Sequence, residues 1–501
     1  MIWILVPFIL LALSILTQAM LKPESPRGRV AVLLQLAIGI SLVACGVYAV
    51  FYLAADAGAP TRFWSAPTVT LIAGRFHFAP TLYLDARNGL LLIMMGLALP
   101  LIFFWLRATF AEAGASFFIS ADILILGLLG AFLSDSLLLF YVFFEVSLIG
   151  AYFWIGLHGT SERVGSGEFG ALTRFLLFTL VGSLAMLVAI TAIFAATGHD
   201  ARLSNLPALV STLSPTLRFW SAAGFFLAFA VKMPLFLFHG WMRETYRGAP
   251  PAARAVLSAV MSKLGAYGFL MILVPAYGAD LTAIAGVLQV IAVGGVFYGS
   301  FMCFGVKSFR DVLIYSSLTH LSLIALGIFA AMTGAERDAS PIQAALFQMF
   351  NHGLIMGALF ALEGRIARDG SAEHDFGGLR ARLPRLSGIL LLTVFVAISL
   401  PGTGSFAAEL LILFAAYRNS LPACLIALFG LLVAAAALVR VYHRNFLGAE
   451  RGPTAMIAPD LTLSETAAGI ACGALWIVTG FYPMLILGAL EPVALLVAPG
   501  R

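Results

Sequence analysis

The feature that most constrains this chain is a succession of long apolar segments that continues over nearly its whole length. A helix needs roughly 20 mostly apolar residues to cross the hydrocarbon core of a bilayer. Such segments lie near 1–20, 29–54, 88–106, 117–134, 136–157, 171–197, 217–242, 252–275, 282–304, 311–332, 340–364, 385–415, 421–446 and 464–488. Only 11% of the residues are charged, against about 25% in ordinary soluble domains. The sequence therefore predicts an all-α integral membrane protein with about fourteen transmembrane helices.

The positions of the basic residues predict how the chain is oriented in the membrane. The net charge is +5, but the basic residues stand singly in short connections, which is unlike a nucleic-acid-binding surface. They are concentrated in the connections after odd-numbered spans, for example at Arg243, Arg247 and Arg254. Because cytoplasmic loops are enriched in lysine and arginine, we expect a multi-pass protein of a bacterial inner membrane with both termini outside the cytoplasm.

The cysteines and the first residues predict neither a redox centre nor a cleaved leader. Cys45, Cys303, Cys424 and Cys472 all lie in apolar segments, without the paired spacing of iron–sulfur or zinc ligands. We therefore expect no cofactor and no metal in this chain. The first 20 residues lack a basic start and a small-residue cleavage site, which indicates a retained first span.

Two spans are interrupted near the middle of the membrane. Pro234 interrupts the seventh span in AFAVKMPLFLFHGW, and Pro401, Gly402 and Gly404 interrupt the twelfth in ISLPGTGSFAAELL. Broken helices at corresponding places are typical of inverted repeats whose ion path lies near each break. The alternative is that these residues only kink their helices. The predicted units are N-terminal helices in 1–116, a first repeat of helices 4–8 in 117–275, a second repeat of helices 9–13 in 282–446, and a last helix in 447–501.

Lysine is rare in this chain, and half of the lysines lie within spans. The chain has four lysines, Lys22, Lys232, Lys263 and Lys307. Lys232 precedes the Pro234 break, and Lys263 lies near the middle of the eighth span. A charge at the bilayer centre costs ~2.5–3.5 kcal/mol on insertion scales. A buried ammonium can release its proton, whereas a guanidinium stays charged, so both mid-span lysines are candidate proton carriers. The alternative for Lys232 is that its side chain extends to the membrane interface.

Two carboxylates also lie within spans. Glu145 lies in the middle of the fifth span, in LLLFYVFFEVSLIGAYFW, and Glu409 follows the break in the twelfth. A carboxylate in the membrane needs a partner from another helix, and we expect Glu145 to pair with a lysine whose hold on its proton depends on that pairing. The alternative is a static ion pair that only fixes helix packing.

His320 in the tenth span and His352 in the eleventh lie between Glu145 and Glu409 in the sequence, and Gln348 and Asn351 stand beside His352. Histidine accepts a proton on one ring nitrogen and donates one from the other, which would suit a relay through water. The alternative is that each histidine makes one hydrogen bond between helices. No second ligand stands at metal-binding spacing on the same helix face.

Six segments together resemble a known family, the proton-translocating antiporter-like subunits of respiratory complex I, and most closely subunit M, the counterpart of mitochondrial subunit 4. These segments follow the family's order between about residues 117 and 446. They are VFFEVSLIGAYFWIG, FAVKMPLFLFHGW with the following GAPPAA, SKLGAYGFL, DVLIYSSLTHLSLIALGIFA, NHGLIMGALF and SLPGTGSFAAELLIL.

The resemblance implies a role for each residue singled out above. Glu145 and Lys232 would pair near the entrance of a half-channel, Lys263 would be the central proton carrier, and Glu409 would be the exit-side site. His320 and His352 would lie between them. Antiporters and the longer L-type subunit usually carry a lysine where this chain has Glu409, which favours the M type.

The function implied is that of a proton-pumping subunit of NADH-quinone oxidoreductase, a translocase. NAD(H), FMN, iron–sulfur clusters and quinone would be bound by other subunits, and the partners would be neighbouring membrane subunits. Two alternatives stay open. The first is a subunit of a cation/proton antiporter. The second is a catalytically silent membrane scaffold, or the membrane module of a related hydrogenase-type or inorganic-carbon-uptake complex.

Overall fold

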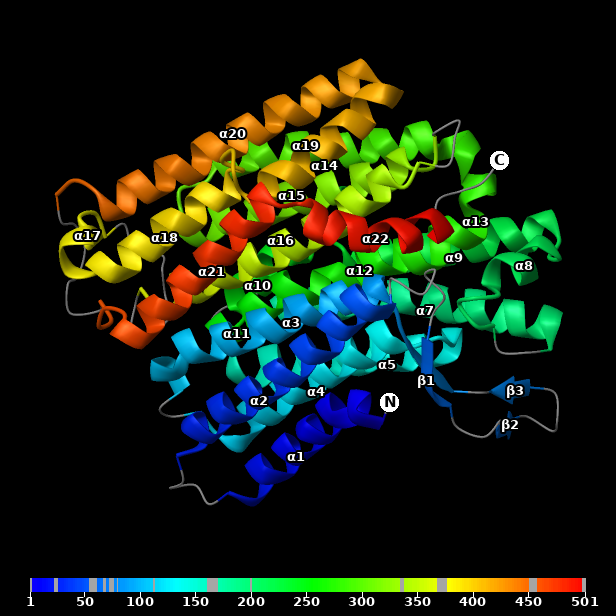
Figure 1. Ribbon diagram of the computed structural model, residues 1–501, viewed down its shortest axis with the longest axis horizontal. Helices are drawn as coiled ribbons and strands as arrows, with labels where there is room; N and C mark the ends of the chain where they lie inside the picture. Colours follow the sequence, from blue (N-terminus) through cyan, green and yellow to red (C-terminus); the bar gives the residue numbers. More distant parts are fainter. Residues whose placement is uncertain are drawn as a thin grey trace.

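The protein is a bundle of helices that lie side by side (Figure 1). The computed structural model describes residues 2–21, 26–53, 61–65, 69–71, 76–78, 80–110, 113–159, 170–198, 201–333, 338–366, 376–449 and 457–497. Eleven helices among these residues are long and apolar enough to cross a membrane. The predicted all-α membrane protein is thereby confirmed, while the number of fourteen spans and the inverted repeats stay predictions.

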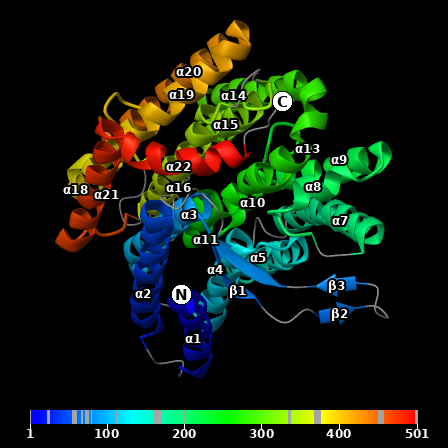
Figure 2. The ribbon, with the colours of Figure 1, turned by 45° about the vertical axis from the view of Figure 1, so that its right-hand side comes forward.

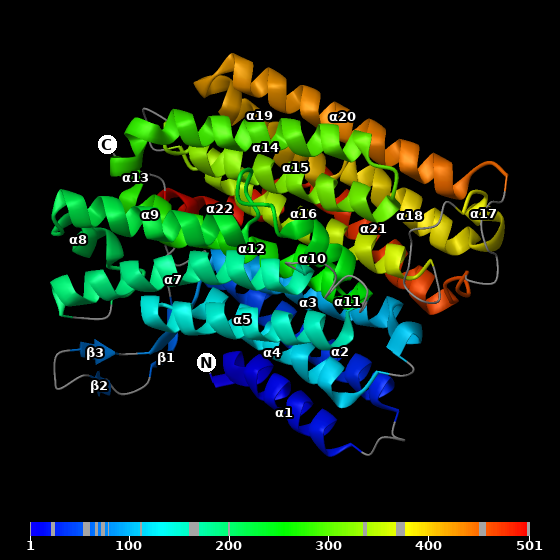
Figure 3. The ribbon, with the colours of Figure 1, turned by 180° about the vertical axis from the view of Figure 1, so that it is seen from behind.

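The first half of the chain forms one side of the bundle, with α1 at its edge (Figures 1 and 3). The first turn, Ile2–Leu5, is a 3-10 helix, and α2 continues as a π-helical turn, Ala49–Leu53. The helices are α1 (Val6–Met20), α2 (Arg27–Tyr48), α3 (Ala86–Trp105), α4 (Ala115–Leu133), α5 (Leu137–His158), α7 (Ala171–Thr197), α8 (Leu206–Ser211), α9 (Pro215–Lys232), α10 (Met242–Gly248), α11 (Pro251–Val256), α12 (Ser262–Gly268) and α13 (Val274–Leu281).

The second half packs beside the first, with α20 at the opposite edge (Figures 1 and 3). Helices α15 and α16 lie in the interior, because the apolar windows of both are wholly buried. The helices are α14 (Ala285–Gly305), α15 (Phe309–Ala330), α16 (Ser340–Gly364), α17 (Leu379–Arg382), α18 (Pro384–Ala397), α19 (Gly404–Asn419), α20 (Leu421–Phe446), α21 (Leu463–Phe481) and α22 (Met484–Val497). The last predicted span, near 464–488, is thus divided between α21 and α22.

Both predicted breaks are present. Helix α9 ends at Lys232 and α10 begins only at Met242, while α18 ends at Ala397 and α19 begins at Gly404. Backbone groups released inside a membrane need new partners. The indole nitrogen of Trp241 donates to the carbonyl of Val231 at 3.1 Å, so one carbonyl freed at the first break is hydrogen-bonded by a side chain.

Lys263 lies between two irregular turns of an otherwise continuous helical stretch, Pro251–Gly305. Before it, Leu257–Met261 forms a π-helical turn, and after it Phe269–Leu273 forms another. Such turns release or shift backbone carbonyls and occur frequently at functional sites. The carbonyl of Ser258, in the first turn, accepts a hydrogen bond from the Lys263 ammonium at 2.6 Å.

Two small antiparallel sheets lie in the connection between α2 and α3, where the sequence suggested no strands. Strand β1 (Thr61–Ser65) pairs with β4 (Thr81–Leu84), with an irregularity between Arg62 and Trp64. Strand β2 (Val69–Leu71) pairs with β3 (Phe76–Phe78) and projects from the edge of the bundle (Figure 2). Strand β4 is buried, and the hydroxyl of its Tyr83 lies 2.6 Å from the hydroxyl of Tyr267 in α12.

Close helix contacts depend on glycine at several positions. A Cβ added at Gly265 of α12 would lie 2.6 Å from the backbone nitrogen of Met233 and from the carbonyl oxygen of Phe229. Small residues allow membrane helices to approach this closely. Gly265 therefore brings α12 into backbone contact with the end of α9, next to Lys232.

We predict that Gly265→Ala destabilises the protein by about 1–3 kcal/mol, the usual cost of overpacking a filled interior. The measurement is the thermal unfolding temperature in detergent. Gly286→Ala in α14 is the matched control, because an added Cβ there meets no atom within 4 Å. Equal unfolding temperatures for the two variants would contradict the role assigned to Gly265.

Candidate functional site

Five of the six predicted site residues are buried polar groups in the interior of the bundle. Lys263 is fully buried, and Lys232, His352, Glu409 and His320 are between 1% and 6% exposed. Glu145 is partly buried. They come from α9, α12, α16, α15 and α19, with Glu145 on α5. These five buried side chains point into the protein, as a polar path through a membrane bundle requires.

The closest contact in the series joins Lys263 to His352. The Lys263 ammonium lies 2.7 Å from Nδ1 of His352 and 3.3 Å from the hydroxyl of Ser262. An ammonium has no lone pair to accept with, so a charged Lys263 donates to Nδ1 and the ring proton of His352 then resides on Nε2. That Nε2 is buried and has no hydrogen-bond partner among the described residues. A proton leaving Lys263 therefore has an acceptor in direct contact.

His320 and Glu409 form a second direct pair. Nδ1 of His320 lies 2.8 Å from the carbonyl oxygen of Ser316, and since a carbonyl only accepts, Nδ1 carries a proton. Nε2 lies 3.3 Å from a carboxylate oxygen of Glu409. A hydrogen bond there requires one more proton, held either by the histidine as imidazolium or by Glu409 as a neutral acid. The pair can thus exchange one proton between two atoms.

Glu409 is also held by two neutral donors. The amide nitrogen of Gln348 donates to its Oε1 at 2.9 Å, and the hydroxyl of Ser405 donates to the same oxygen at 3.3 Å. The hydroxyls of Ser405 and Ser399 lie 3.0 Å apart. Ser399 stands in the gap between α18 and α19, so the polar contacts continue from Glu409 into the second helix break.

The two histidines connect the two pairs. Their ring centroids lie 5.8 Å apart, at an interplanar angle of 34°. Three buried side-chain oxygens near them lack a hydrogen-bond partner among the described residues. They are Ser316 Oγ, Gln348 Oε1 and Asn351 Oδ1. Buried polar groups of this kind are usually satisfied by ordered water, so the space around the histidines suits a water-mediated proton step.

Lys232 stands at the other end of the series, and its direct partners differ from the expected one. Its ammonium donates to the hydroxyl of Ser147 at 3.0 Å and lies 4.4 Å from the ring centroid of Phe144. No direct ion pair joins it to Glu145 in the described part of the chain, and Oε1 of Glu145 has no partner there. Glu145 lies two residues before Ser147 on α5 and is near enough to act on the Lys232 ammonium electrostatically, without a direct ion pair.

The structure therefore brings four predicted residues into two contacting pairs and leaves two nearby. Lys263 contacts His352, and His320 contacts Glu409. Lys232 lies on a helix that touches α12 at Gly265. We call Lys232, Lys263, His352, His320 and Glu409 together the polar axis.

A buried cluster that the sequence did not indicate fixes one end of the helices that carry the axis. Glu363 of α16 accepts from Arg254 of α11 at 3.0 Å and from Arg310 of α15 at 2.8 Å, and all three side chains are at most 3% exposed. These three helical segments lead to His352, Lys263 and His320. The sequence signal was weak, because Glu363 lies at the end of an apolar span and resembles an interface residue.

We predict that Glu363→Gln is strongly destabilising, by about 3–5 kcal/mol, because it leaves two buried guanidinium groups without their carboxylate. A second change, Arg310→Gln, should restore part of the loss by removing one of the two charges. The measurement is thermal unfolding in detergent. Glu244→Gln is the control, since Glu244 and its partner Arg243 are over a third exposed and such pairs contribute only ~0–1 kcal/mol. Equal effects at positions 363 and 244 would refute the prediction.

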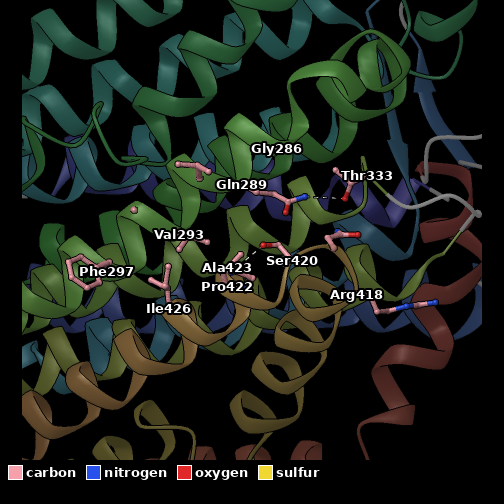
Figure 4. Close-up of a pocket in the computed structure, with 13 residues that line it drawn as sticks. Gly286, Gln289, Val293, Phe297, Thr333, Arg418, Ser420, Pro422, Ala423 and Ile426 are labelled. Atoms are coloured by element: carbon pink, nitrogen blue, oxygen red, sulfur yellow. Dashed lines mark hydrogen bonds between the residues drawn. The ribbon is translucent and has the colours of Figure 1, made fainter.

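A groove on the membrane-facing side lies apart from this chemistry. It has a volume of about 790 Å³ and lies between α14 and the start of α20 (Figure 4). Its walls are mainly apolar, with Val293, Phe297 and Ile426 among them, and Arg418 lies at one end. None of the six predicted residues lines it, so it is not part of the site.

Comparison with known proteins places these features in context. The family described as NADH:quinone oxidoreductase/Mrp antiporter, transmembrane region, matches residues 134–434, which include all six predicted site residues. The chain is 32% identical over 371 residues to NADH-quinone oxidoreductase subunit M of Pseudomonas aeruginosa, covering 72% of this chain and 70% of that protein. It is 31% identical over 375 residues to the Escherichia coli K12 subunit of the same name, covering 72% and 71%.

Solved structures give the same fold. A chain of respiratory complex I from Thermus thermophilus matches with a TM-score of 0.80 and 26% identity, over 99% of this chain and 98% of that one. A chain of the Mrp complex from a Dietzia species matches with a TM-score of 0.78 over 99% and 97%, but at 18% identity it supports the fold alone.

Proposed function

Since the chain belongs to the NADH:quinone oxidoreductase/Mrp antiporter membrane family, we propose that it is the proton-pumping M-type subunit of an NADH-quinone oxidoreductase and that the polar axis carries the proton. The single observation that supports the axis most strongly is the buried 2.7 Å contact between the Lys263 ammonium and Nδ1 of His352. A mid-membrane lysine in contact with a neutral base has a place to deliver its proton. The chain is thus one subunit of a translocase.

Each residue of the axis has a role in the proposal. Lys232 is the entrance-side carrier, held by Ser147 and influenced by Glu145 on the same helix as that serine. Lys263 is the central carrier and His352 its direct acceptor. His320 passes the proton to Glu409, the exit-side group. Because Lys232 and Lys263 are both cationic when protonated, a proton on one disfavours a proton on the other, which drives transfer in steps.

The two-repeat organisation is part of the proposal. The predicted units 117–275 and 282–446 each contain one broken helix, and each break adjoins a member of the axis, Lys232 in the first and Glu409 in the second. Inverted repeats place ion sites at such breaks. The flanking units, 1–116 and 447–501, would support the bundle from outside the repeats.

The proposal extends to the surroundings of the chain. The protein is multi-pass and belongs to a bacterial-type respiratory complex family. We infer that it resides in the inner membrane with both termini outside the cytoplasm, beside other antiporter-like subunits. NAD(H), FMN, iron–sulfur clusters and quinone would be bound by other subunits.

The experiment that tests this assignment is purification of the chain, mildly solubilised, from its own membranes with a terminal affinity tag. We expect flavin- and iron–sulfur-containing subunits to co-purify, together with NADH-dependent quinone reduction. Co-purification with hydrogenase-type or carbon-uptake subunits would overturn the NADH-driven assignment. Sodium-dependent proton exchange in vesicles without NADH would instead support the antiporter alternative, and near-normal pumping after loss of Lys263 would support a silent scaffold.

A further inference from the structure

One intramembrane carboxylate lies outside the polar axis. Asp122 stands within α4, well inside a span of nineteen residues, and is 1% exposed. The hydroxyl of Ser14 on α1 lies 2.6 Å from its Oδ2, and the amide nitrogen of Gln35 on α2 donates to its Oδ1 at 2.8 Å. Three helices therefore meet at this one carboxyl group. It also lies outside the segment 134–434 that defines the family.

No cation balances Asp122 within the described part of the chain. Helix α1 contains no charged residue, and those of α2 are confined to its first turn, Arg27 and Arg29. Asp122 is the only charged residue of α4. Helix α5, which packs on α4, contributes Tyr141, Glu145, Tyr152 and the terminal His158. The other elements with several contacts to α4 are α3, with Arg87 paired to Asp85, α12, with Lys263 and Tyr267, and β4, with Tyr83. Tyr267 donates to the carbonyl of Phe132, near the last residue of α4, so α12 meets α4 away from Asp122. The described residues show no ion pair to Asp122, so its surroundings are neutral.

The neutral amide groups around Asp122 are only partly hydrogen-bonded. Gln18 stands one helical turn after Ser14, on the same face of α1, and both its amide atoms are buried without a partner among the described residues. The amide oxygen of Gln35, whose nitrogen binds Asp122, also lacks one. Both glutamines are neutral, so neither supplies a counter-ion to Asp122.

We propose that Asp122 binds a proton of its own, which makes the meeting point of α1, α2 and α4 a proton-binding site separate from the polar axis. An ionised carboxylate in this neutral interior would have only two hydrogen bonds to replace its hydration, and a buried charge without a counter-ion takes up a proton instead. The neutral acid retains both contacts, with Gln35 donating to one oxygen and the acid proton directed to the Ser14 hydroxyl. The site therefore holds α1 and α2 against α4 in its protonated state.

Infrared spectroscopy of the purified complex tests this directly, because a protonated carboxylic acid and a carboxylate absorb in different regions. The spectrum of the wild type minus that of Asp122→Asn should contain the carbonyl band of one protonated acid. The asparagine variant has nearly the same shape and keeps both hydrogen-bond partners. A carboxylate signal in its place would overturn the proposal, and a carboxylate signal that depends on added sodium would assign the site to a metal cation instead.

Two further variants serve as a substitute for Asp122→Asn and as a control. Ser14→Ala should shift the acid band without removing it, which keeps the proposal testable if Asp122→Asn fails to assemble. Asp280→Asn is the control, since Asp280 is about a third exposed and paired with Arg218, so its loss should remove a carboxylate band only. At alkaline pH, amide hydrogen exchange in α1 should rise in the wild type, because deprotonation weakens the three-helix contact, but not in Asp122→Asn. Equal alkaline exchange in both proteins would contradict the proton site.

Discussion

Replacing Lys263 by alanine should abolish proton pumping in the assembled complex while leaving NADH oxidation by an artificial acceptor intact. Lys263 links the carbonyl of Ser258, in the π-helical turn, to Nδ1 of His352, and alanine removes both the proton and the contact. A positioned acid or base typically accelerates proton transfer by ~10²–10⁴-fold, so we expect the rate of pumping to fall by at least about two orders of magnitude. The measurement is proton uptake into reconstituted vesicles, alongside quinone reduction.

Lys307→Ala is the matched control for this experiment. Lys307 is exposed in the connection between α14 and α15, so the same substitution there removes a lysine without touching the axis. The two variants should assemble equally but differ in pumping. Normal pumping by the Lys263 variant would exclude it as the central carrier.

The second large effect is expected at Glu409. Glu409→Gln keeps the shape of the side chain and an oxygen that can accept from Gln348, but it cannot exchange a proton with His320. We therefore expect pumping to fall by about 10²-fold or more, with little change in assembly or thermal stability. Glu409→Asp should recover part of the activity, because it restores an ionisable carboxyl at a slightly different distance.

Glu491→Gln controls for the loss of a carboxylate. Glu491 is exposed on α22 and is not among the hydrogen-bond or ion-pair partners described for His320 and Glu409. If Glu409→Gln pumped protons like Glu491→Gln, the exit-side role would be wrong. If it failed only because the protein did not assemble, the aspartate variant would separate the proton role from the packing role.

The sequence alone predicted those features that follow from the cost of placing charge or backbone in hydrocarbon. A bundle of many apolar spans, a break after Lys232 and a break before Gly404 were expected, and the structure has eleven candidate spans among the described residues and both breaks. A mid-span lysine is conspicuous for the same reason, because the membrane allows few exceptions. The burial of Lys232 and Lys263 fits that expectation.

The contacts between helices could not be predicted in this way. Nothing in the local sequence shows that Lys232 donates to Ser147 and forms no direct ion pair with Glu145, because that choice depends on how α9 is rotated against α5. The Glu363 cluster depends in the same way on the packing of three helical segments. Asp122 is different, since the rule that singled out Glu145 applies equally to a lone carboxylate in α4, and its significance emerged only from its contacts with Ser14 and Gln35.

The most direct test of the whole account is a high-resolution experimental density map of the complex, read for ordered water between the members of the polar axis. We predict ordered water at two places. One group of water molecules links Nε2 of His352 to His320 and is hydrogen-bonded to the unpartnered oxygens of Ser316, Gln348 and Asn351. A second group lies between Lys232 and Lys263. A dry, apolar barrier at both places, in every state of the complex, would contradict proton transfer along this path.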